Sequence, residues 1–249
     1  MSKVFVVGIG PGSYEQMTIK AVESLQNSDV IIGYTVYIDL VKEKFPDKLF
    51  LSTPMTQEVK RCKMAFEEAK KGKTVSIICS GDPGVYGMAG LMHEVGVEYP
   101  KVELEIVPGV SAALGGAALL GAPLIHDFCV ISLSDLLTPF ETIEHRLKVA
   151  AEADFVVCLY NPSSKKRQDY LQKACDIVLK ERSKDTICGI VENIAREGEA
   201  MRIMTLQELR DIKVDMFHTV FIGNSQTKVL NGRMVTPRGY HFDCKKNHF

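Results

Sequence analysis

The chain has 249 residues, of which 46% are hydrophobic and 24% charged, and its 30 basic residues nearly balance 31 acidic ones. This length accommodates one large domain or two of ordinary size, and the apolar content excludes a disordered chain. The formal net charge of −1 argues against a general nucleic-acid-binding protein, which normally carries a basic excess. The seven cysteines form no C-x-x-C pair, so we expect reduced, buried thiols and no protein metal site.

The first residues, MSKVFVVGIG, pass directly into a predicted strand and show no signal-peptide pattern. The longest apolar stretch covers residues 112–125 and includes three glycines and a proline. It is too short to cross a hydrocarbon layer of about 30 Å. We therefore expect a cytoplasmic protein without a membrane partner.

Short β-branched runs alternate with longer amphipathic patterns along the first half of the chain. The predicted strands are residues 4–7, 30–32, 74–79 and 104–107, and the predicted helices are residues 15–27, 57–71 and 86–95. Such alternation is typical of an α/β fold with a largely parallel sheet. The strands are continuously apolar, which fits a sheet covered on both faces.

The alternation breaks at residues 108–123, which are rich in glycine and alanine, and then resumes. The second half contains predicted strands at 128–132, 155–160, 186–191 and 219–222, predicted helices at 139–153, 165–181 and 206–213, and a polar, hairpin-like segment at 192–205. We place a boundary near residue 122, which gives two α/β domains, 1–122 and 123–249. Residues 241–249 are expected to form a frayed tail.

A glycine-rich turn, Gly8-Ile9-Gly10-Pro11-Gly12-Ser13, separates the first predicted strand from its helix. Such turns can hold a pyrophosphate at a helix N-terminus, as in dinucleotide-binding oxidoreductases. The fingerprint is incomplete, because Ser13 replaces its last glycine and Asp29 precedes the second strand instead of ending it. No P-loop motif is present. A nucleotide-binding oxidoreductase remains an alternative, and so does a plain tight turn.

Two further loops follow predicted strands in the same way. They are SGDPGVYG at residues 80–87 and VPGVSA at residues 107–112. In a parallel sheet, the loops at the carboxyl ends of the strands line the ligand crevice. Three loops at equivalent positions, residues 8–13, 80–87 and 107–112, therefore predict one surface that binds a small ligand, which we call the floor of the site.

In this order and spacing, GIGPGS, SGDPGVYG and VPGVSA resemble the tetrapyrrole methylases. The likeness continues over residues 3–240 and implies two α/β domains of the class III methyltransferase type, with the active site in the cleft between them. The segments HDFCVISLSDLLTP, CLYNPSSKKR and TPRGY resemble the branch that methylates C17 of precorrin-3B or cobalt-factor III in cobalamin biosynthesis, with ring contraction. Methylation of another ring carbon, such as C11 of precorrin-4, stays an alternative.

The resemblance implies S-adenosyl-L-methionine as cofactor, with S-adenosyl-L-homocysteine as product, a tetrapyrrole substrate that can carry cobalt, and a homodimer. It also implies which residues bind the cofactor. In the first half these are Pro11, Gly81, Asp82, Val85, Tyr86, Ser111 and Ala112. In the second half they are Tyr160, Asn161, Val191, Glu192, Gly223 and Asn224.

The implied substrate bears several carboxylates, so its site should concentrate cations despite the neutral total charge. Lys165, Lys166 and Arg167 follow a predicted strand, and Arg196 lies in the polar hairpin-like segment. The alternative is that residues 165–167 form the solvated first turn of a helix. Three cations at a helix N-terminus would oppose its macrodipole, which favours the functional interpretation.

Ring contraction requires proton transfer as well as methylation. His126, Asp127, Ser134 and Asp135 follow the small-residue segment and are the candidate acid–base residues. The alternative is structural: His126-Asp127 as a turn, and Ser134-Asp135 as a helix cap. No Ser-His-Asp or H-E-x-x-H signature accompanies them.

Overall fold

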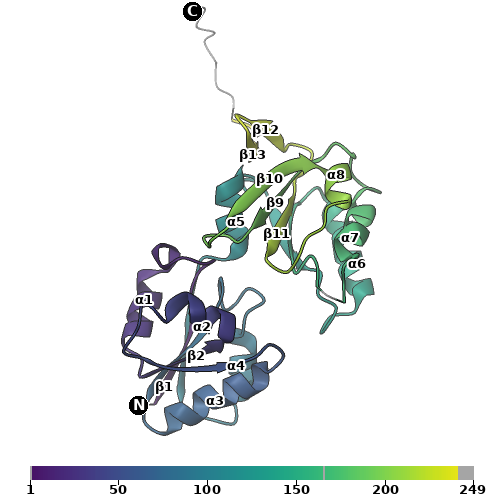
Figure 1. The fold of residues 1–249 in the computed structure, drawn as a ribbon. Coiled ribbons are helices and arrows are strands. Elements are labelled where there is room, and N and C mark those ends of the chain that lie inside the picture. Colours follow the sequence, from purple (N-terminus) through teal and green to yellow (C-terminus); the bar gives the residue numbers. More distant parts are fainter. Residues whose placement is uncertain (1, 165, 241–249) are drawn as a thin grey trace, which may run out of the picture. The chain divides into compact units, whose positions relative to one another are not determined.

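The computed structural model describes residues 2–164 and 166–240 (Figure 1). The chain divides into two compact units: Met1–Gly115 with Asn193–Gly198, and Gly116–Glu192 with Glu199–Phe249. The boundary that the sequence suggests, near residue 122, falls a few residues after the division at Gly115. Nothing in the sequence pattern indicates that residues 193–198 pack with the first unit. The expected tail, 241–249, lies outside the described residues.

The first unit is built on a five-stranded sheet in which every pair is parallel. Its strands are β1 (Lys3–Gly8), β2 (Val30–Tyr34), β3 (Leu49–Thr53), β4 (Thr74–Cys79) and β5 (Glu103–Val107), in the order β3-β2-β4-β1-β5. Its helices are η1 (Tyr14–Gln16), α1 (Ile19–Gln26), α2 (Thr35–Val41), α3 (Glu58–Lys70) and α4 (Ala89–Gly96). The predicted α/β class is confirmed. The sequence pattern missed α2 and β3, because TVYIDLV has the β-branched and aromatic residues of a strand.

Two apolar clusters pack on this sheet. One contains Cys62 and Phe66 of α3 and Met92 of α4, and the other contains Leu25 of α1 and Ile38 of α2. The strands contribute to both clusters, since alternate side chains of a strand point to opposite faces. Coverage of both faces accounts for the continuously apolar strand sequences.

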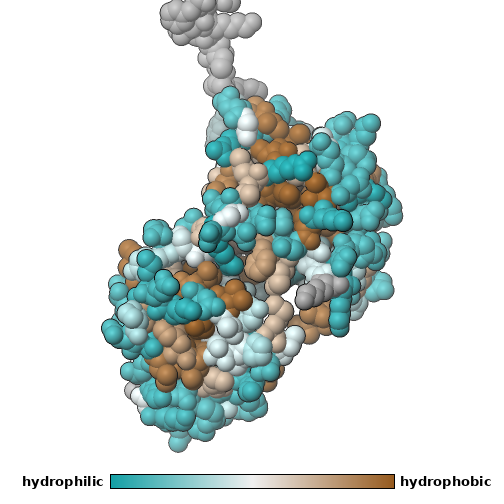
Figure 2. All heavy atoms as spheres, viewed as in Figure 1, coloured by the Kyte–Doolittle hydropathy of each residue, from teal (hydrophilic) through white to brown (hydrophobic). Residues whose placement is uncertain are grey.

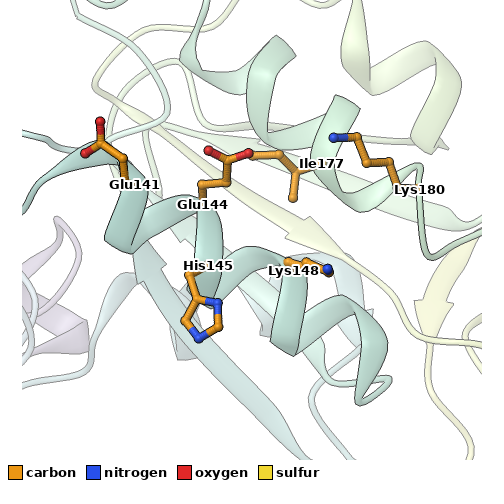
Figure 3. Close-up of a pocket in the computed structure, with 6 residues that line it drawn as sticks. All are labelled: Glu141, Glu144, His145, Lys148, Ile177 and Lys180. Atoms are coloured by element: carbon orange, nitrogen blue, oxygen red, sulfur yellow. The ribbon is translucent and has the colours of Figure 1, made fainter.

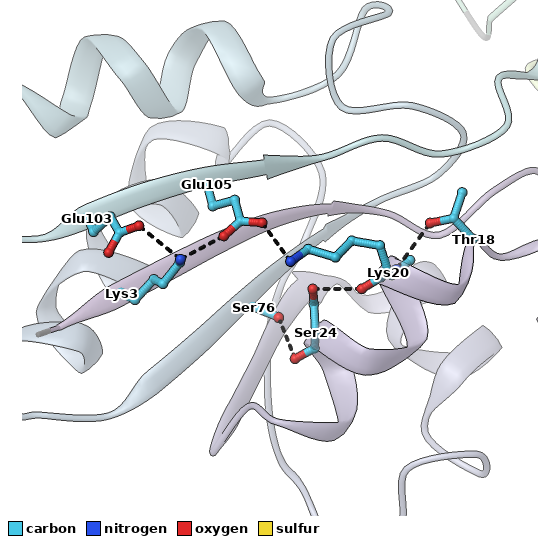
Figure 4. Close-up of polar contacts among 8 residues, drawn as sticks. Lys3, Thr18, Lys20, Ser24, Ser76, Glu103 and Glu105 are labelled. Carbon is cyan, nitrogen blue, oxygen red and sulfur yellow. Dashed lines mark hydrogen bonds and ion pairs between the residues drawn. The ribbon is translucent and has the colours of Figure 1, made fainter.

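Polar contacts attach α1 to the sheet (Figure 4). Thr18 caps the helix by accepting a hydrogen bond from the backbone N–H of Ala21, and Lys20 forms an ion pair with Glu105 of β5. Buried hydroxyls of Ser28 and Ser76 lie 2.7 Å apart. The first loop is therefore followed by a helix with a fixed start.

The second unit contains a mixed sheet of β7 (Phe128–Ser132), β8 (Val156–Tyr160), β9 (Ile187–Glu192), β10 (Ala200–Thr205) and β11 (His218–Ile222), in the order β10-β9-β11-β8-β7. Only β7 and β8 pair in parallel; β11 is antiparallel to β8 and β9, and β10 is antiparallel to β9. The expectation of a largely parallel sheet is therefore correct for the first unit and wrong for the second. The physical reason is the predicted hairpin, which reverses the chain within a few residues.

The helices of the second unit are α6 (Phe140–Glu152), α7 (Tyr170–Val178) and α8 (Leu206–Arg210), packed on one apolar cluster with the sheet. A small sheet joins β12 (Lys228–Leu230), β13 (Arg233–Val235) and β6 (Gly121–Ala122). The segment 108–123, where the pattern broke, contains a further helix, α5 (Ala112–Leu120). No helix of residues 2–164 and 166–240 is both long enough and apolar enough to span a membrane.

Arg182 holds together the end of α6 and the turn after β11. Its guanidinium donates hydrogen bonds to the carbonyl oxygens of Ala150, Ala151, Phe155 and Gly223. Burial lowers the pKa of Arg182, but the group stays charged at neutral pH. The arginine thus adds a charged donor to two carbonyls at the end of α6 and to two in the neighbouring turns.

We predict that Arg182→Ala destabilises the chain by about 2–4 kcal/mol, because several half-buried carbonyls lose a charged donor. Arg146→Ala is the matched control, since Arg146 is exposed on α6. Urea denaturation followed by circular dichroism measures both changes. Equal stability of the two variants would contradict this role.

Candidate active site

The structure brings the three glycine-rich loops together at the carboxyl edge of the first sheet. They follow β1, β4 and β5, which are neighbours in the sheet. Beyond the strands, Gly10 and Gly81 exchange backbone hydrogen bonds in both directions, with N–O distances of 3.2 and 2.8 Å. Thr18, the cap of α1, donates to the carbonyl oxygen of Pro108 in the third loop at 3.3 Å. Hydrogen bonds therefore join the three loops of the predicted floor to one another and to the start of α1.

Glycine is required where the loops meet. A Cβ added to Gly109 would lie 2.2 Å from the carbonyl oxygen of Gly81 and 2.8 Å from the backbone of Gly8. Real Cβ atoms do not approach backbone this closely, so no other residue fits without moving a loop. These glycines allow three main chains to touch directly.

The carboxylate of Asp82 links the second loop to the third. Oδ1 accepts the backbone N–H of Gly84 at 2.8 Å, and Oδ2 accepts the backbone N–H of Gly109 at 3.0 Å. Both oxygens are thus engaged by the loops themselves. Asp82, which the resemblance implies as a cofactor residue, acts in this structure as a cross-link.

The remaining predicted residues of the first unit lie around this floor. Pro11 and Ser111 are buried, Val85 is half-buried, and Ala112 begins α5. Tyr86 is 56% exposed and has a φ of +52°. An aromatic residue in the left-handed region is strained, and such strain clusters at functional sites.

The thiols near the strand ends are not nucleophiles. Burial raises the pKa of Cys79, the last residue of β4, to about 11. Burial also raises the pKa of Cys188 in β9. Because the thiolate is the reactive form, both groups are inert at neutral pH.

Three loops of the second unit also share one edge, because β7, β8 and β9 run in the same direction. Ser132, Tyr160 and Glu192 end these strands. The side-chain amide of Asn161 donates to Ser132 Oγ at 2.9 Å, and Asn161 has a φ of +54°. Predicted cofactor residues Tyr160, Asn161 and Glu192 therefore lie at the same edge, with Val191 buried beside them.

Asp135 anchors the loop that follows β7. Its carboxylate accepts the hydroxyl of Tyr170 at 2.7 Å and lies 3.7 Å from Nε of Arg167. Arg167 also donates to Ser164 Oγ and to the carbonyl oxygen of Leu133. The hydrogen bond to Asp135 raises the pKa of Tyr170. Of the predicted residues, Asp135 and Arg167 thus contact each other, and Ser134 lies next to Asp135.

The predicted basic cluster has a different local structure from the one expected. Helix α7 begins at Tyr170, so residues 166 and 167 precede it and do not oppose its macrodipole. Arg167 turns toward the neighbouring loop, while Lys166 is exposed. Lys165 lies outside the described residues. The prediction that a helix begins at residue 165 is therefore wrong, because the backbones of Ser164 and Arg167 hydrogen-bond to each other in both directions and α7 begins only at Tyr170.

Two groups of predicted residues are not brought to this edge. His126 and Asp127 precede β7, whereas Ser134 and Asp135 follow it, and a five-residue strand spans about 16 Å. Gly223 and Asn224 follow β11, whose antiparallel direction places them at the opposite edge from Tyr160. Asn224 is buried and accepts from Gln226 N and Thr227 Oγ1 in its own turn. The four acid–base candidates do not form one cluster.

His218 was missed by the sequence. At the start of β11, its Nδ1 lies 2.7 Å from Asp215 Oδ1 and its Nε2 lies 3.6 Å from Glu192 Oε2. The two carboxylates face different ring nitrogens, so the imidazole lies between two acids, and one ligand atom from each of the three residues lies within 4.8 Å of the others. Sequence spacing cannot reveal it, because strand pairing joins residues 192 and 218.

A shallow groove lies on the helix layer of the second unit (Figure 3). Its lining residues come from α6, α7 and the turn after α7, and they are Glu141, Glu144, His145, Lys148, Ile177 and Lys180. Acidic and basic side chains are mixed, so the groove has no charge preference. It contains none of the predicted site residues.

We predict that Gly109→Ala destabilises the chain by at least about 2 kcal/mol, because its Cβ meets backbone that cannot move independently. Gly90→Ala is the control: nothing lies within 4 Å of its added Cβ, and alanine in α4 should stabilise by about 0.5 kcal/mol. Thermal and urea unfolding measure both. A tolerated Gly109→Ala would show that the loops do not touch in solution.

We also predict that Asp135→Asn lowers the pKa of Tyr170 toward its ordinary value. The carboxylate disfavours the phenolate, so its neutralisation makes ionisation easier. Titration of ¹³C-labelled tyrosine by NMR, with Tyr170→Phe to assign the signal, measures the shift. Asp127→Asn should leave it unchanged, and an unshifted signal in Asp135→Asn would contradict the contact.

Comparison with known proteins identifies the family. A family model described as Tetrapyrrole (Corrin/Porphyrin) Methylases matches residues 3–210. The chain is 47% identical over 236 residues to a Salmonella typhimurium protein named probable cobalt-factor III C(17)-methyltransferase, covering 94% of this chain and 98% of that protein. It is 48% identical over 243 residues to the cobalt-factor III methyltransferase of Priestia megaterium, covering 96% of this chain but 45% of that protein.

A solved structure agrees with this relationship. The crystal structure of the methyltransferase CobJ matches with a TM-score of 0.87 at 33% identity, covering 95% of this chain and 100% of that one. The chain therefore spans about half the length of one curated relative and nearly all of another. Sequence and fold lead to the same conclusion: the chain belongs to the tetrapyrrole (corrin/porphyrin) methylases.

Proposed function

We propose that the chain transfers a methyl group from S-adenosyl-L-methionine to C17 of precorrin-3B or its cobalt counterpart, cobalt-factor III, with ring contraction, in cobalamin biosynthesis. The observation that carries this proposal is the rigid floor of three touching loops at the carboxyl edge of the first sheet. Full-length likeness to a protein named as a C(17)-methyltransferase supports the choice of ring carbon.

The floor suits the chemistry of methyl transfer. When bound, the cofactor supplies a methyl group on a sulfonium, which is already activated for displacement. The protein then has to align the reactants and exclude water, and it needs no nucleophile of its own. Fixed backbone loops meet that need, and the buried thiols, which stay protonated, do not compete for the methyl group.

The residues present fit this cofactor. The small residues of the three loops let a ligand approach the backbone closely, and the side chains of Val85 and Tyr86 beside them are half-buried and exposed, respectively. In the proposal the first unit binds it through Pro11, Gly81, Val85, Tyr86, Ser111 and Ala112, with Asp82 holding the loops. Tyr160, Asn161, Val191 and Glu192 are the proposed contacts of the second unit. Gly223 and Asn224 are left out, because the polar groups of Asn224 are hydrogen-bonded within the turn after β11, at the opposite edge of the sheet.

Cations are proposed to bind the carboxylates of the macrocycle. Lys166 is exposed and suited to this role. Nε and Nη1 of Arg167 already donate to Ser164 and to the carbonyl oxygen of Leu133, so Nη2 is the nitrogen proposed to bind a substrate carboxylate. Ser134 and Asp135 remain the proposed proton-transfer residues, since they lie at the strand-end edge of the second sheet.

We also propose a cytoplasmic homodimer. Hydrophobic side chains gather on the surface over β9, β10 and β13 of the second unit (Figure 2). Met201 of β10 is 39% exposed, and Val229 and Leu230 of β12 are each 47% exposed. Apolar surface of this kind is typical of an interface. The cysteines of the described residues are all free, as in a reducing compartment.

The test incubates the purified chain with ¹³C-methyl S-adenosyl-L-methionine and either macrocycle, and locates the methyl group by NMR. We expect one new signal at C17 and stoichiometric S-adenosyl-L-homocysteine. A methyl at C11 would overturn the assignment of the ring carbon. Calorimetry that detects saturable NAD binding but no S-adenosyl-L-homocysteine binding would replace the proposal with the oxidoreductase alternative.

A further inference from the structure

Residues 193–198 form part of the first unit although they connect two strands of the second. Within this segment, Arg196 contacts two of the three glycine-rich loops. Its Nε donates to the carbonyl oxygen of Pro11 at 3.0 Å, and its Nη2 donates to Ser80 Oγ at 3.0 Å. Pro11 belongs to the first loop and Ser80 begins the second, so one guanidinium spans both.

The segment is shaped to present this side chain. Asn193 and Ala195 have φ angles of +49° and +56°, and the N–H of Arg196 closes the turn on the carbonyl oxygen of Asn193 at 2.9 Å. Ile194, only 5% exposed, anchors the turn in the core. Alanine in the left-handed region costs about 1 kcal/mol, so tertiary packing must hold this conformation.

Gly12 of the first loop lies against residues 194–196, with no room for a side chain between them. A Cβ at Gly12 would lie 2.5 Å from Cγ of Arg196 and 2.6 to 2.7 Å from the carbonyl oxygens of Ile194 and Ala195. Glycine therefore lets the segment lie directly on the loop. This explains the second glycine of the G-P-G sequence, which a nucleotide fingerprint does not.

The charge of Arg196 has no acidic partner among the residues that the structure describes. Burial lowers the pKa of Arg196, yet the guanidinium remains protonated at neutral pH. Its guanidinium donates to a carbonyl and a hydroxyl, neither of which neutralises its charge. Both acceptors belong to loops of the proposed cofactor site, whereas the acceptors of Arg182 lie at a helix end and a turn of the second unit.

We propose that Arg196 is a positioning residue that fixes the first and second loops relative to each other, so that the cofactor meets a preformed floor. The inference rests on the proposed function and goes beyond it, because it assigns to Arg196 a role in cofactor binding in place of a substrate contact. Arginine reaches the two acceptors from two separate nitrogens, Nε and Nη2, whereas lysine would have to reach both from the single position of its Nζ.

The test measures the binding of S-adenosyl-L-homocysteine by calorimetry for the full chain and its variants. We expect Arg196→Ala to raise the Kd about 10- to 100-fold, Arg196→Lys to raise it less, and added guanidinium ion to restore part of the affinity in Arg196→Ala. The KM for the cofactor should rise more than kcat falls. Arg146→Ala and Gly90→Ala are the controls and should bind as the unchanged chain does.

Two milder or independent changes keep the test decisive if Arg196→Ala does not fold. Ser80→Ala removes one acceptor only and should raise the Kd about threefold to tenfold. Gly12→Ala keeps the guanidinium but displaces the segment, because its Cβ would collide with Cγ of Arg196 and the carbonyl oxygens of Ile194 and Ala195, and it should weaken binding as Arg196→Ala does.

The outcomes separate this inference from the proposed function. If the unchanged chain does not bind S-adenosyl-L-homocysteine, the proposed function fails. If it binds and the Arg196 variants bind within twofold of it, the positioning role is wrong. A rise in the KM for the macrocycle with an unchanged Kd for S-adenosyl-L-homocysteine would also overturn it and return Arg196 to substrate binding. A lower Tm with unaltered affinity would mark a purely structural residue.

Discussion

Direct contact between backbones at the carboxyl edge of the first sheet is the constraint on which the proposed site depends. Gly8 and Gly109 lie so close to each other and to the carbonyl oxygen of Gly81 that a Cβ on either of them would collide with backbone. This contact is possible because β4, β1 and β5 are adjacent and parallel, so their loops emerge side by side. Loops that touch through backbone have little freedom to move, which is what alignment of a methyl donor requires.

Two charged side chains add hydrogen bonds between these loops, one as an acceptor and the other as a donor. Asp82 accepts backbone N–H groups from the second and third loops, and Arg196 donates to the first and second. The carboxylate of Asp82 accepts from backbone N–H groups, and the guanidinium of Arg196 donates to a carbonyl and a hydroxyl. The two charged groups do not pair with each other. The result is a floor held by charge-assisted hydrogen bonds, which are stronger than neutral ones.

The second unit shows how strand direction decides which residues can act together. His126 and Asp135 are near in sequence but separated by the whole of β7, while Glu192 and His218 are distant in sequence and adjacent through strand pairing. Gly223 and Asn224 are placed at the far edge by the antiparallel β11. A list of candidate residues transferred by resemblance carries no information about these edges.

The sequence by itself determined the α/β class, most element positions, and the three loops, because apolar periodicity and glycine motifs are local properties of the chain. It could not reveal α5, whose glycine- and alanine-rich sequence lacks a clear periodic pattern, or the start of α7 at Tyr170. Only the tertiary structure decided the roles of Gly12, Arg196 and His218. Each depends on segments that meet through packing or strand pairing, and non-local contacts of this kind leave no periodic signal in the sequence.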